Sequence, residues 1–333
     1  MIQLSYIIPF YKGEKTIFTM MDSIFAMGIS ETEFEVIVVD DCSPVTASDV
    51  LKELVKQHSN VRIIRHEINK RQGGAKNTGI RAAKGKYIAF ADQDDVINPR
   101  NLCEALSVAI QNDVDMLACH YSIRRKNGRT QEDGMDRGDG AFMSGKEFCE
   151  QYFMSGYNLA PWANLYKREF LMRVAHPYEE NVVMEDSDWI AWHWIHANKV
   201  GIYNHSIYTW VMNSASITHS FSYINRADWI KFGYRKIRDA KVYMDISPKF
   251  AELMIEDGRQ NIIGGMKKVW KVDNYQMFYH HLGDTLIELQ QMKWSGIVHG
   301  LINHPAQSIF VLSIVGPVIK TINYVRRKLM RKV

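Results

Sequence analysis

The stretch Lys86–Val96, Lys-Tyr-Ile-Ala-Phe-Ala-Asp-Gln-Asp-Asp-Val, decides how the rest of the chain is interpreted. Tyr87–Ala91 is an uncharged run of apolar and aromatic residues, which predicts a short buried strand. Asp92, Asp94 and Asp95 follow at once, and the first two are expected to share one side because side chains alternate along an extended backbone. Such a cluster is costly unless a cation offsets it, and a divalent metal that also binds substrate phosphates would do so. The alternative is a polar turn after a strand, where aspartate is common.

The bulk properties describe a mildly basic chain with enough apolar residues for a large core. Its 333 residues predict about two domains, or one large domain with an extension, and 46% of them are hydrophobic. The net charge of +4 does not indicate nucleic acid as a partner, and we expect none. None of the four cysteines forms a CxxC pair, which argues against a zinc site and a disulfide scaffold.

No export signal or membrane span is predicted. Met1–Phe10 lacks the basic, apolar and small-residue regions of a signal peptide. The longest apolar run, Ile309–Ile319, is shorter than the roughly 20 residues that cross a bilayer. We therefore expect a cytoplasmic location.

Buried strands alternate with helices along the first part of the chain. Strands are expected at 4–9, 35–39, 61–65, 87–91 and 116–121, and helices at 14–27, 49–57, 75–83 and 98–111. This alternation predicts an α/β fold with a parallel sheet flanked by helices. Ligands bind such sheets at the carboxyl ends of the strands, where Pro9, Asp40, Asp41 and the aspartates after Ala91 all fall. The convergence favours a site for a metal and a nucleotide over a plain turn.

A glycine-rich segment, Asn69–Gly79, leads into the helix expected at 75–83. Gly73 and Gly74 would let the backbone approach a phosphate or a base, near the positive end of the helix. Lys70, Arg71 and Lys76 add cations. The segment is neither a Walker loop nor a dinucleotide fingerprint, and a tight turn that uses glycine only for its dihedral angles is the alternative.

Three later segments carry candidate side chains, each with an ordinary structural alternative. Trp162 lies among amides and could stack on a sugar ring, or it is a core tryptophan at a domain seam. Glu185 and Asp186 begin an aromatic helix and suit a general base, although acidic residues favour any helix N-terminus. His219, in a polar loop after two short strands expected within 200–211, could contact a phosphate or the metal, or is an ordinary histidine.

The C-terminal third differs in pattern. Residues 221–300 are helical in pattern and rich in aromatics. In 308–333 an apolar run leads into a basic cluster, which suits an interfacial helix on an anionic membrane face. The alternative is a helix packed on the same protein with a solvated basic tail.

Taken together, these stretches resemble family 2 glycosyltransferases of the GT-A fold. The matching segments are Ser5–Tyr11, Val38–Ser43, Gly73–Ile80, Ala83–Asp95 and Glu185–Asp186. Their order and spacing match over about residues 1–220. The resemblance implies a catalytic domain at 1–220, with a nucleotide-sugar half at 1–97 and an acceptor half at 98–220, a helical extension at 221–305, and an amphipathic basic segment at 306–333.

The resemblance also implies an inverting transferase that moves sugar from a nucleotide-diphosphate sugar, expected to be a UDP-sugar, with Mn²⁺ or Mg²⁺. The residues implied to bind the nucleotide sugar are Pro9, Tyr11, Asp40, Asp41, Arg71, Gly74, Lys76, Asn77, Asp92 and Gln93. Asp94 and His219 are implied for the metal, and Trp162 and Asp95 for the acceptor. Asp186 would be the base for the acceptor hydroxyl, with Glu185 beside it.

The chain departs from the usual family pattern at three places. Lys12 replaces a common asparagine, Lys76 replaces a common arginine, and Met212 lies near the place of a usual basic residue. The implied acceptor is a glycan or a lipid-linked sugar in bacterial surface polysaccharide synthesis. With the basic C-terminal segment, this suggests a peripheral position on the inner face of the plasma membrane.

Two rival functions are weighed against this one. A sugar-phosphate nucleotidyltransferase should carry a glycine- and arginine-rich loop directly after the first strand, and Phe10–Lys15 does not. A catalytically inactive module that binds a nucleotide sugar or a membrane would need neither Asp94 nor Asp186.

Overall fold

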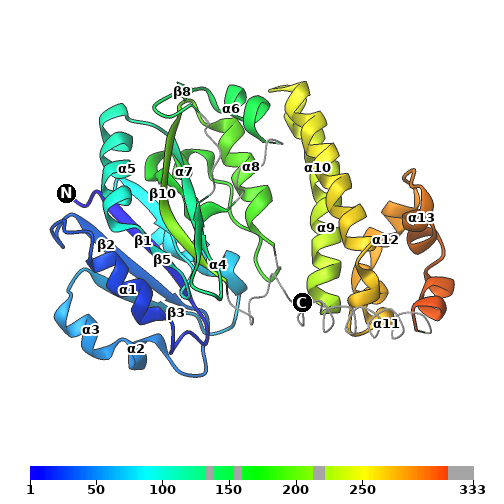
Figure 1. The fold of residues 1–333 in the computed structure, drawn as a ribbon, viewed down its shortest axis with the longest axis horizontal. Helices are drawn as coiled ribbons and strands as arrows, with labels where there is room; N and C mark the ends of the chain where they lie inside the picture. The colour runs from blue at the N-terminus through cyan, green and yellow to red at the C-terminus, as the bar shows by residue number, and fades with distance from the viewer. Residues whose placement is uncertain (133–137, 154–159, 183, 213–221, 314–333) are drawn as a thin grey trace. The chain divides into compact units, whose positions relative to one another are not determined.

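The computed structural model describes residues 1–132, 138–153, 160–182, 184–212 and 222–313. The chain divides into two compact units, Met1–Asn213 and Ser214–Val333, and both are drawn in Figure 1. No helix within the described ranges combines the length and the apolar character needed to cross a membrane.

The first unit is built on one mixed sheet. Its strands are β1 (Leu4–Phe10), β2 (Phe34–Asp40), β3 (Val61–Arg65), β4 (Tyr87–Phe90), β5 (Val96–Ile97), β6 (Met116–Arg124), β7 (Thr130–Glu132), β8 (Phe142–Met143), β9 (Asn164–Lys167) and β10 (Val200–Val211). The main path through the sheet runs β3-β2-β1-β4-β9-β6-β10-β5, with β7 beside β6 and β8 beside β10. The pairs β1/β2, β2/β3, β1/β4 and β6/β10 are parallel, as predicted for a doubly covered sheet.

Helices cover both faces of this sheet (Figure 1). They are α1 (Ile17–Phe25), α2 (Ala47–Val50), α3 (Lys52–Gln57), α4 (Arg71–Ala82), α5 (Pro99–Asn112), α6 (Gly145–Tyr152), α7 (Arg168–Val174) and α8 (Asp186–His196). On one face Tyr6 and Ile8 of β1 share a core with Met20 of α1 and Leu102 of α5. On the other face α4 packs closely on β1, because a Cβ on Gly79 would lie 2.3 Å from a methyl carbon of Ile7.

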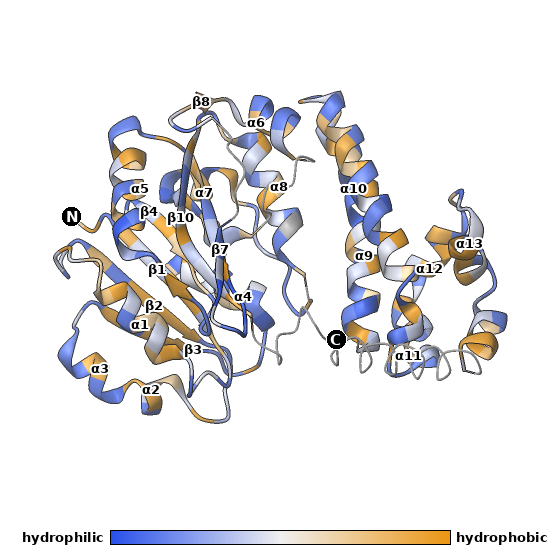
Figure 2. Cartoon of the chain, in the orientation of Figure 1, coloured by the Kyte–Doolittle hydropathy of each residue, from blue (hydrophilic) through white to orange (hydrophobic). Residues whose placement is uncertain are grey.

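Both faces of the central strands are buried, which explains why their sequences are continuous apolar runs. Every residue of β1, β2 and β4 is buried, and Figure 2 shows the hydrophobic colouring concentrated along these strands. Alternation of polar and apolar residues is lost when both faces of a strand are covered.

Three sequence-based expectations about the fold need correction. The sheet is less parallel than expected, because β9 inserts antiparallel between β4 and β6. The segment 200–211 is one strand with register shifts between Tyr203 and Tyr208, rather than two short strands. Helix α4 begins at Arg71, so Gly73 and Gly74 lie in its first turn and not in a turn before it.

The second unit is helical in its described part. It contains α9 (Tyr223–Asp239), α10 (Pro248–Met266), α11 (Tyr275–Leu282), α12 (Asp284–Gln290) and α13 (Gly296–Asn303). Helices α9 and α10 cross closely at glycines, since a Cβ on Gly233 would lie 2.7 Å from the carbonyl oxygen of Gly258. Its core includes Ile230, Ile262 and Phe278.

Candidate functional site

The loops after β1, β2 and β4 meet at one edge of the sheet. Because β1 lies between the other two strands, its carboxyl end adjoins both. Side chains then tie the loops together. The backbone N–H of Lys12 donates to Ser43 Oγ at 2.9 Å, and the Gln93 amide both accepts from Tyr11 N at 3.0 Å and donates to Tyr11 O at 2.8 Å. A Cβ on Gly13 would lie 2.1 Å from Gln93 Oε1, so a larger residue there would displace the Gln93 amide.

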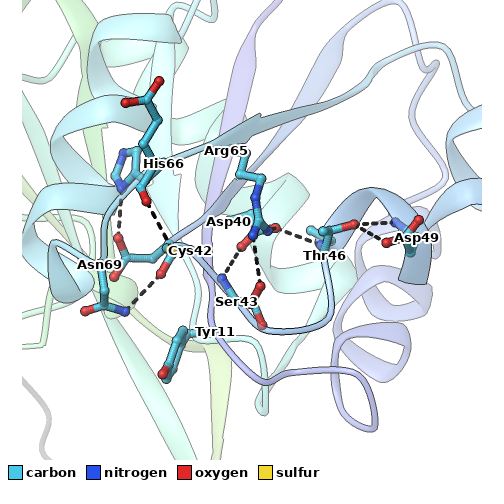
Figure 3. A network of polar contacts seen from close by, with 12 residues as sticks. Tyr11, Asp40, Cys42, Ser43, Thr46, Asp49, Arg65, His66 and Asn69 are labelled. Atoms are coloured by element: carbon cyan, nitrogen blue, oxygen red, sulfur yellow. Dashed lines mark hydrogen bonds and ion pairs between the residues drawn. The ribbon is translucent and has the colours of Figure 1, made fainter.

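Asp40 and Asp41 are adjacent in the chain but have different surroundings, and Figure 3 shows Asp40 with Ser43 and Arg65 around it. Asp40 is fully buried, and its carboxylate accepts from Ser43 N, Ala47 N and Arg65 Nη1 at 2.8, 2.9 and 2.5 Å. This arrangement makes Asp40 a support for the loop and leaves no exposed surface for the nucleotide contact expected of it.

Asp41 instead joins the strand edge to the start of α4. Its Oδ1 lies 2.8 Å from His66 Nδ1 and accepts from Lys70 N at 2.8 Å, while Asn69 donates to its carbonyl oxygen at 2.9 Å. His66 Nε2 lies 2.9 Å from Thr78 Oγ1, which fixes the ring from both sides. Figure 3 draws this cluster with Tyr11 nearby, and the Tyr11 side chain is 42% exposed. Asp41 itself is 3% exposed, so the cluster presents the Tyr11 ring at its surface and the Asp41 carboxylate from within for contact with a nucleobase.

The loop after β4 holds three carboxylates in unequal settings. Asp95 is 1% exposed, accepts from Tyr208 Oη at 2.8 Å and from Val211 N at 2.7 Å, and so anchors β10. The Asp95 carboxylate thus serves the fold, and the acceptor contact expected of it stays a prediction. Tyr208 Oη also accepts from Asp92 N at 2.9 Å.

Asp92 and Asp94 remain partly exposed at this edge. Burial raises the pKa of Asp92 to about 6, with Asp94 adding to the rise and Lys76 opposing it. Burial also raises the pKa of Asp94. A cation near the two would stabilise their ionised forms.

Asp92 and Asp94 could hold a metal ion only if the substrate supplied some of its ligands. Within the described residues, no group of three or more His, Cys, Asp or Glu side chains could hold a metal ion by itself. Mg²⁺ and Mn²⁺ can be held by one or two carboxylates with phosphate and water oxygens completing the shell. Asp94, with Asp92 beside it, supplies such a donor set, whereas His219 lies outside the described residues.

Lys76 is the cation at the centre of the remaining cluster. Its side chain is 1% exposed, and its Nζ donates to Glu185 Oε1 at 3.0 Å and to Asp186 Oδ1 at 2.5 Å. The ammonium also lies 5.1 Å from the ring centroid of Tyr178. The structure thus places Lys76 on the two acidic residues at the start of α8, with Asp186 keeping 30% of its side chain exposed.

Charges within this cluster shift its pKa values in different directions. Burial would lower the pKa of Lys76, but Asp186, Glu185 and Asp92 together raise it. Burial would raise the pKa of Glu185, but Lys76 and hydrogen bonds lower it. Burial and Glu185 raise the pKa of Asp186 to about 8, against the opposing effect of Lys76. One cation shared by two carboxylates thus leaves Asp186 as the more basic carboxylate.

The face of α4 that carries Lys76 also holds the segment before α8. Asn77 donates to Tyr178 O at 2.9 Å and accepts from Tyr178 N at 2.8 Å, so its amide is used inside the protein rather than on a ligand. A Cβ on Gly73 would lie 2.3 Å from the carbonyl oxygen of Glu179, and one on Gly74 would lie 2.4 Å from Lys70 Cβ. Close packing, more than backbone freedom, therefore requires these glycines.

Trp162 lies between two tyrosines, in the part of the chain expected to bind the acceptor. Its ring stacks on Tyr208 with centroids 4.4 Å apart and meets Tyr121 edge-on at 5.1 Å. It is partly buried, so it contributes to the core while part of its surface remains exposed.

The fold and the clustered carboxylates define an α/β protein with one acidic cluster at the strand ends and a second one, at the start of α8, that interacts with it electrostatically. The model of the family described as "Glycosyl transferase family 2" matches residues 5–171. The chain belongs to this family.

Curated relatives are similar over parts of their length. The chain is 27% identical over 219 residues to the uncharacterized glycosyltransferase EpsJ of Bacillus subtilis, covering 65% of this chain and 62% of the relative. It is 32% identical over 130 residues to the poly(ribitol-phosphate) beta-N-acetylglucosaminyltransferase TarS of Staphylococcus aureus, covering 39% of this chain and 22% of that protein. Less than two thirds of the length of these two relatives is thus matched.

A solved structure shares the fold. Residues 1–349 of S. aureus TarS superpose with a TM-score of 0.66 at 18% identity, covering 93% of this chain and 89% of that one. The same fragment solved with UDP-GlcNAc gives a TM-score of 0.60 at 16% identity. The likeness establishes the GT-A fold.

Three residues of the site were not anticipated from the sequence. His66 directly follows β3, so the strand-end rule that selected Asp41 could have found it. Tyr178 and Tyr208 carried no such signal, since each is one aromatic residue among many.

Proposed function

We propose that this protein is an inverting glycosyltransferase that moves a sugar from a UDP-sugar to a hydroxyl group of a glycan or lipid-linked acceptor in bacterial surface polysaccharide synthesis. Family membership supports the transferase class. The observation that carries the proposal is the Asp186 carboxylate, which is partly exposed, held by Lys76 and within electrostatic reach of Asp92 at the strand ends. A base and a donor site placed together in this way suit direct transfer.

The donor half would bind the nucleotide. We assign Tyr11 and Asp41 to contacts with the nucleobase, and Asp92 and Gln93 to contacts with the ribose. The cationic Arg71, partly exposed at the start of α4, is assigned to the diphosphate. The TarS structures solved with UDP and with UDP-GlcNAc support a uridine nucleotide in the donor, and we assign the transferred group as a hexose or an N-acetylhexosamine.

Asp94, with Asp92 beside it, would hold Mn²⁺ or Mg²⁺. When bound, the metal would supply positive charge to the leaving diphosphate. The carboxylates of this loop would keep the ion close to the donor site.

The chemical step follows from the groups of the chain. The Asp186 carboxylate takes the proton of the acceptor hydroxyl, and the acceptor oxygen forms a bond to the anomeric carbon. The bond from that carbon to the diphosphate oxygen breaks, and its electron pair leaves with the nucleoside diphosphate. One displacement inverts the anomeric configuration, and the proton remains on Asp186 until solvent removes it.

A peripheral membrane position would suit a lipid-linked acceptor. The basic residues of the C-terminal segment, Lys320, Arg326, Arg327, Lys328, Arg331 and Lys332, supply charge for an anionic surface. They lie outside the described residues, and the proposal rests on their sequence.

The test is a panel of nucleotide sugars with Mn²⁺, with Mg²⁺ and with EDTA. Binding is followed by calorimetry and donor consumption by release of the nucleoside diphosphate. We expect one UDP-sugar to bind, Asp94→Ala to weaken that binding, and Asp186→Asn to retain binding while losing turnover. Lys167→Met, which removes an ammonium paired with Asp113 at 2.8 Å outside the site, is the control. If no nucleotide sugar binds with either metal, the proposal is wrong.

A further inference from the structure

Lys76 is a buried cation at the candidate site, with 1% of its side chain exposed, and its position is unusual for a donor-binding cation. Among the described residues, the ion pairs of its ammonium are with Glu185 and Asp186, 109 and 110 residues further along the chain. A buried lysine is costly unless its charge is compensated. The two carboxylates therefore account for its burial.

We propose that Lys76 is a positioning residue for the catalytic base, forming with Glu185 a buried ion pair that orients Asp186 and prepares it to take up the acceptor's proton. This inference rests on the proposed function, in which Asp186 is that base. It assigns to Lys76 a task in the proton transfer, in place of the contact with the nucleotide sugar that the sequence suggested.

The charge balance of the three groups gives the physical reason. Before reaction Lys76, Glu185 and Asp186 carry one positive and two negative charges, so this largely buried cluster has a net charge of minus one. After Asp186 accepts a proton, Lys76 and Glu185 remain as a neutral pair. Proton uptake therefore relieves the repulsion between adjacent carboxylates, while the ammonium keeps Asp186 ionised enough to act at all.

The surroundings of the ammonium keep it in place. The Tyr178 ring lies under it, and that ring stacks on Trp189 of α8 with centroids 4.3 Å apart. Asn77, the next residue of α4, holds the backbone of Tyr178 at both N–H and C=O. Among the described residues, the charged or titratable groups that interact with Asp186 include Lys76 from α4, Glu185 from its own helix, Asp92 from the loop after β4, and Tyr178.

Two substitutions should move the pH dependence of turnover in opposite directions. Lys76→Met removes the charge that lowers the pKa of Asp186. The acid limb of the profile of kcat against pH should therefore move to higher pH by about one to three units. Glu185→Gln removes the charge that raises that pKa, so the limb should move down. Lys76→Arg keeps the charge, and its planar fork suits two carboxylates; we expect the limb to return to within about half a unit of the wild-type position.

A matched control is present in the other unit. Lys236 is also 1% exposed, pairs with Asp257, and lies 4.2 Å from the Phe232 ring centroid. Lys236→Met thus removes a buried, paired lysine over an aromatic ring within the helical unit, and it should leave the acid limb of the kcat–pH profile unmoved.

The experiment measures kcat against pH with the UDP-sugar that the panel identifies, at fixed Mn²⁺, for the wild type and the four variants. In parallel, ¹³C NMR of protein labelled at aspartate carboxyl carbons follows the titration of Asp186, assigned with Asp186→Asn. Opposite shifts in Lys76→Met and Glu185→Gln, in both readouts, support the inference. If the wild type turns over but Lys76→Met lowers kcat without moving either titration, Lys76 is merely structural and the inference is overturned.

The NMR titration also separates this inference from the proposed function. A wild-type protein that consumes no nucleotide sugar refutes the transferase, whatever the titration shows. Should Lys76→Met fail to fold, Glu185→Gln alone decides, since an unmoved Asp186 titration in that variant contradicts the electrostatic coupling.

Discussion

Gly73→Ala is the change that most directly tests how the site is assembled. Gly73 lies in the first turn of α4, where the segment before α8 crosses it. The added Cβ would lie 2.3 Å from the carbonyl oxygen of Glu179 and 3.3 Å from Tyr178 Cβ, whereas ordinary contact begins at 3.4 Å. The nearest atom belongs to backbone, so no side-chain rotation relieves the overlap, and the segment must move by about 1 Å.

The size of the effect follows from two opposing terms. Forcing a methyl group into a packed place costs about 1–3 kcal/mol, and a backbone obstacle favours the upper part of that range. Alanine in place of glycine within a helix returns about 1 kcal/mol. We expect a net loss of about 1–2 kcal/mol, which lowers Tm by roughly 2–8 °C for a unit of this size.

The effect on turnover should be larger than the effect on stability. The displaced segment leads into Glu185 and Asp186, and a misplacement of about 1 Å at a reacting group can cost about 100-fold in rate. The assay compares kcat, UDP affinity and Tm for the wild type and the variant. Affinity for UDP should change little. Gly73 packs against Tyr178 and Glu179, in the segment that leads to the proposed catalytic base, and not against the loops assigned to the nucleotide.

Gly264→Ala supplies the control. Gly264 also lies within a helix, α10, but its added Cβ would meet nothing within 4 Å. That variant should gain stability, by about 0.5–1 kcal/mol, and keep its activity. A Gly73→Ala protein that resembles Gly264→Ala in both respects would refute the close packing described for α4.

Three further predictions concern the supporting residues. Tyr208→Phe removes the hydroxyl that donates to buried Asp95, and it should lower the free energy of unfolding in urea by about 1–3 kcal/mol; an unchanged midpoint would contradict this. Gln93→Ala removes both hydrogen bonds to the Tyr11 backbone, so the Tyr11 loop is less ordered. UDP binding measured by calorimetry should weaken about 10-fold, which corresponds to roughly 1.4 kcal/mol of binding free energy, while Tm stays nearly constant. Burial lowers the pKa of His193 from 6.5 to about 3, so the unfolded chain binds the extra proton and stability should fall as pH drops from about 6.5 toward 3. His193→Phe should show a shallower loss of Tm between pH 8 and 5, and an equal loss in both proteins would argue against the assignment.

The sequence by itself determined the strand positions in the first 97 residues and the edge of the sheet at which the candidate site lies. Apolar runs bounded by polar residues define β1, β2 and β4 because both of their faces are buried. The aspartates after those runs then had to meet, since parallel strands bring their carboxyl ends to one edge. The pair Glu185–Asp186 could likewise be placed at the start of a helix from local pattern alone.

Only the tertiary structure decided what each polar side chain contacts. Asp40 and Asp41 are neighbours of the same type, yet Arg65 and two backbone N–H groups enclose the first, while His66 holds the second. Asp95 turns inward because Tyr208, 113 residues away, supplies its hydrogen bond.

The same holds for the central cation. Local sequence put Lys76 in a glycine-rich segment and suggested a phosphate, but its partners come from 109 and 110 residues further along the chain. Hydrophobic period and turn chemistry are local properties that a sequence displays directly. The burial and pairing of a charge depend on which distant segment packs over it, and that is settled only when the chain has folded.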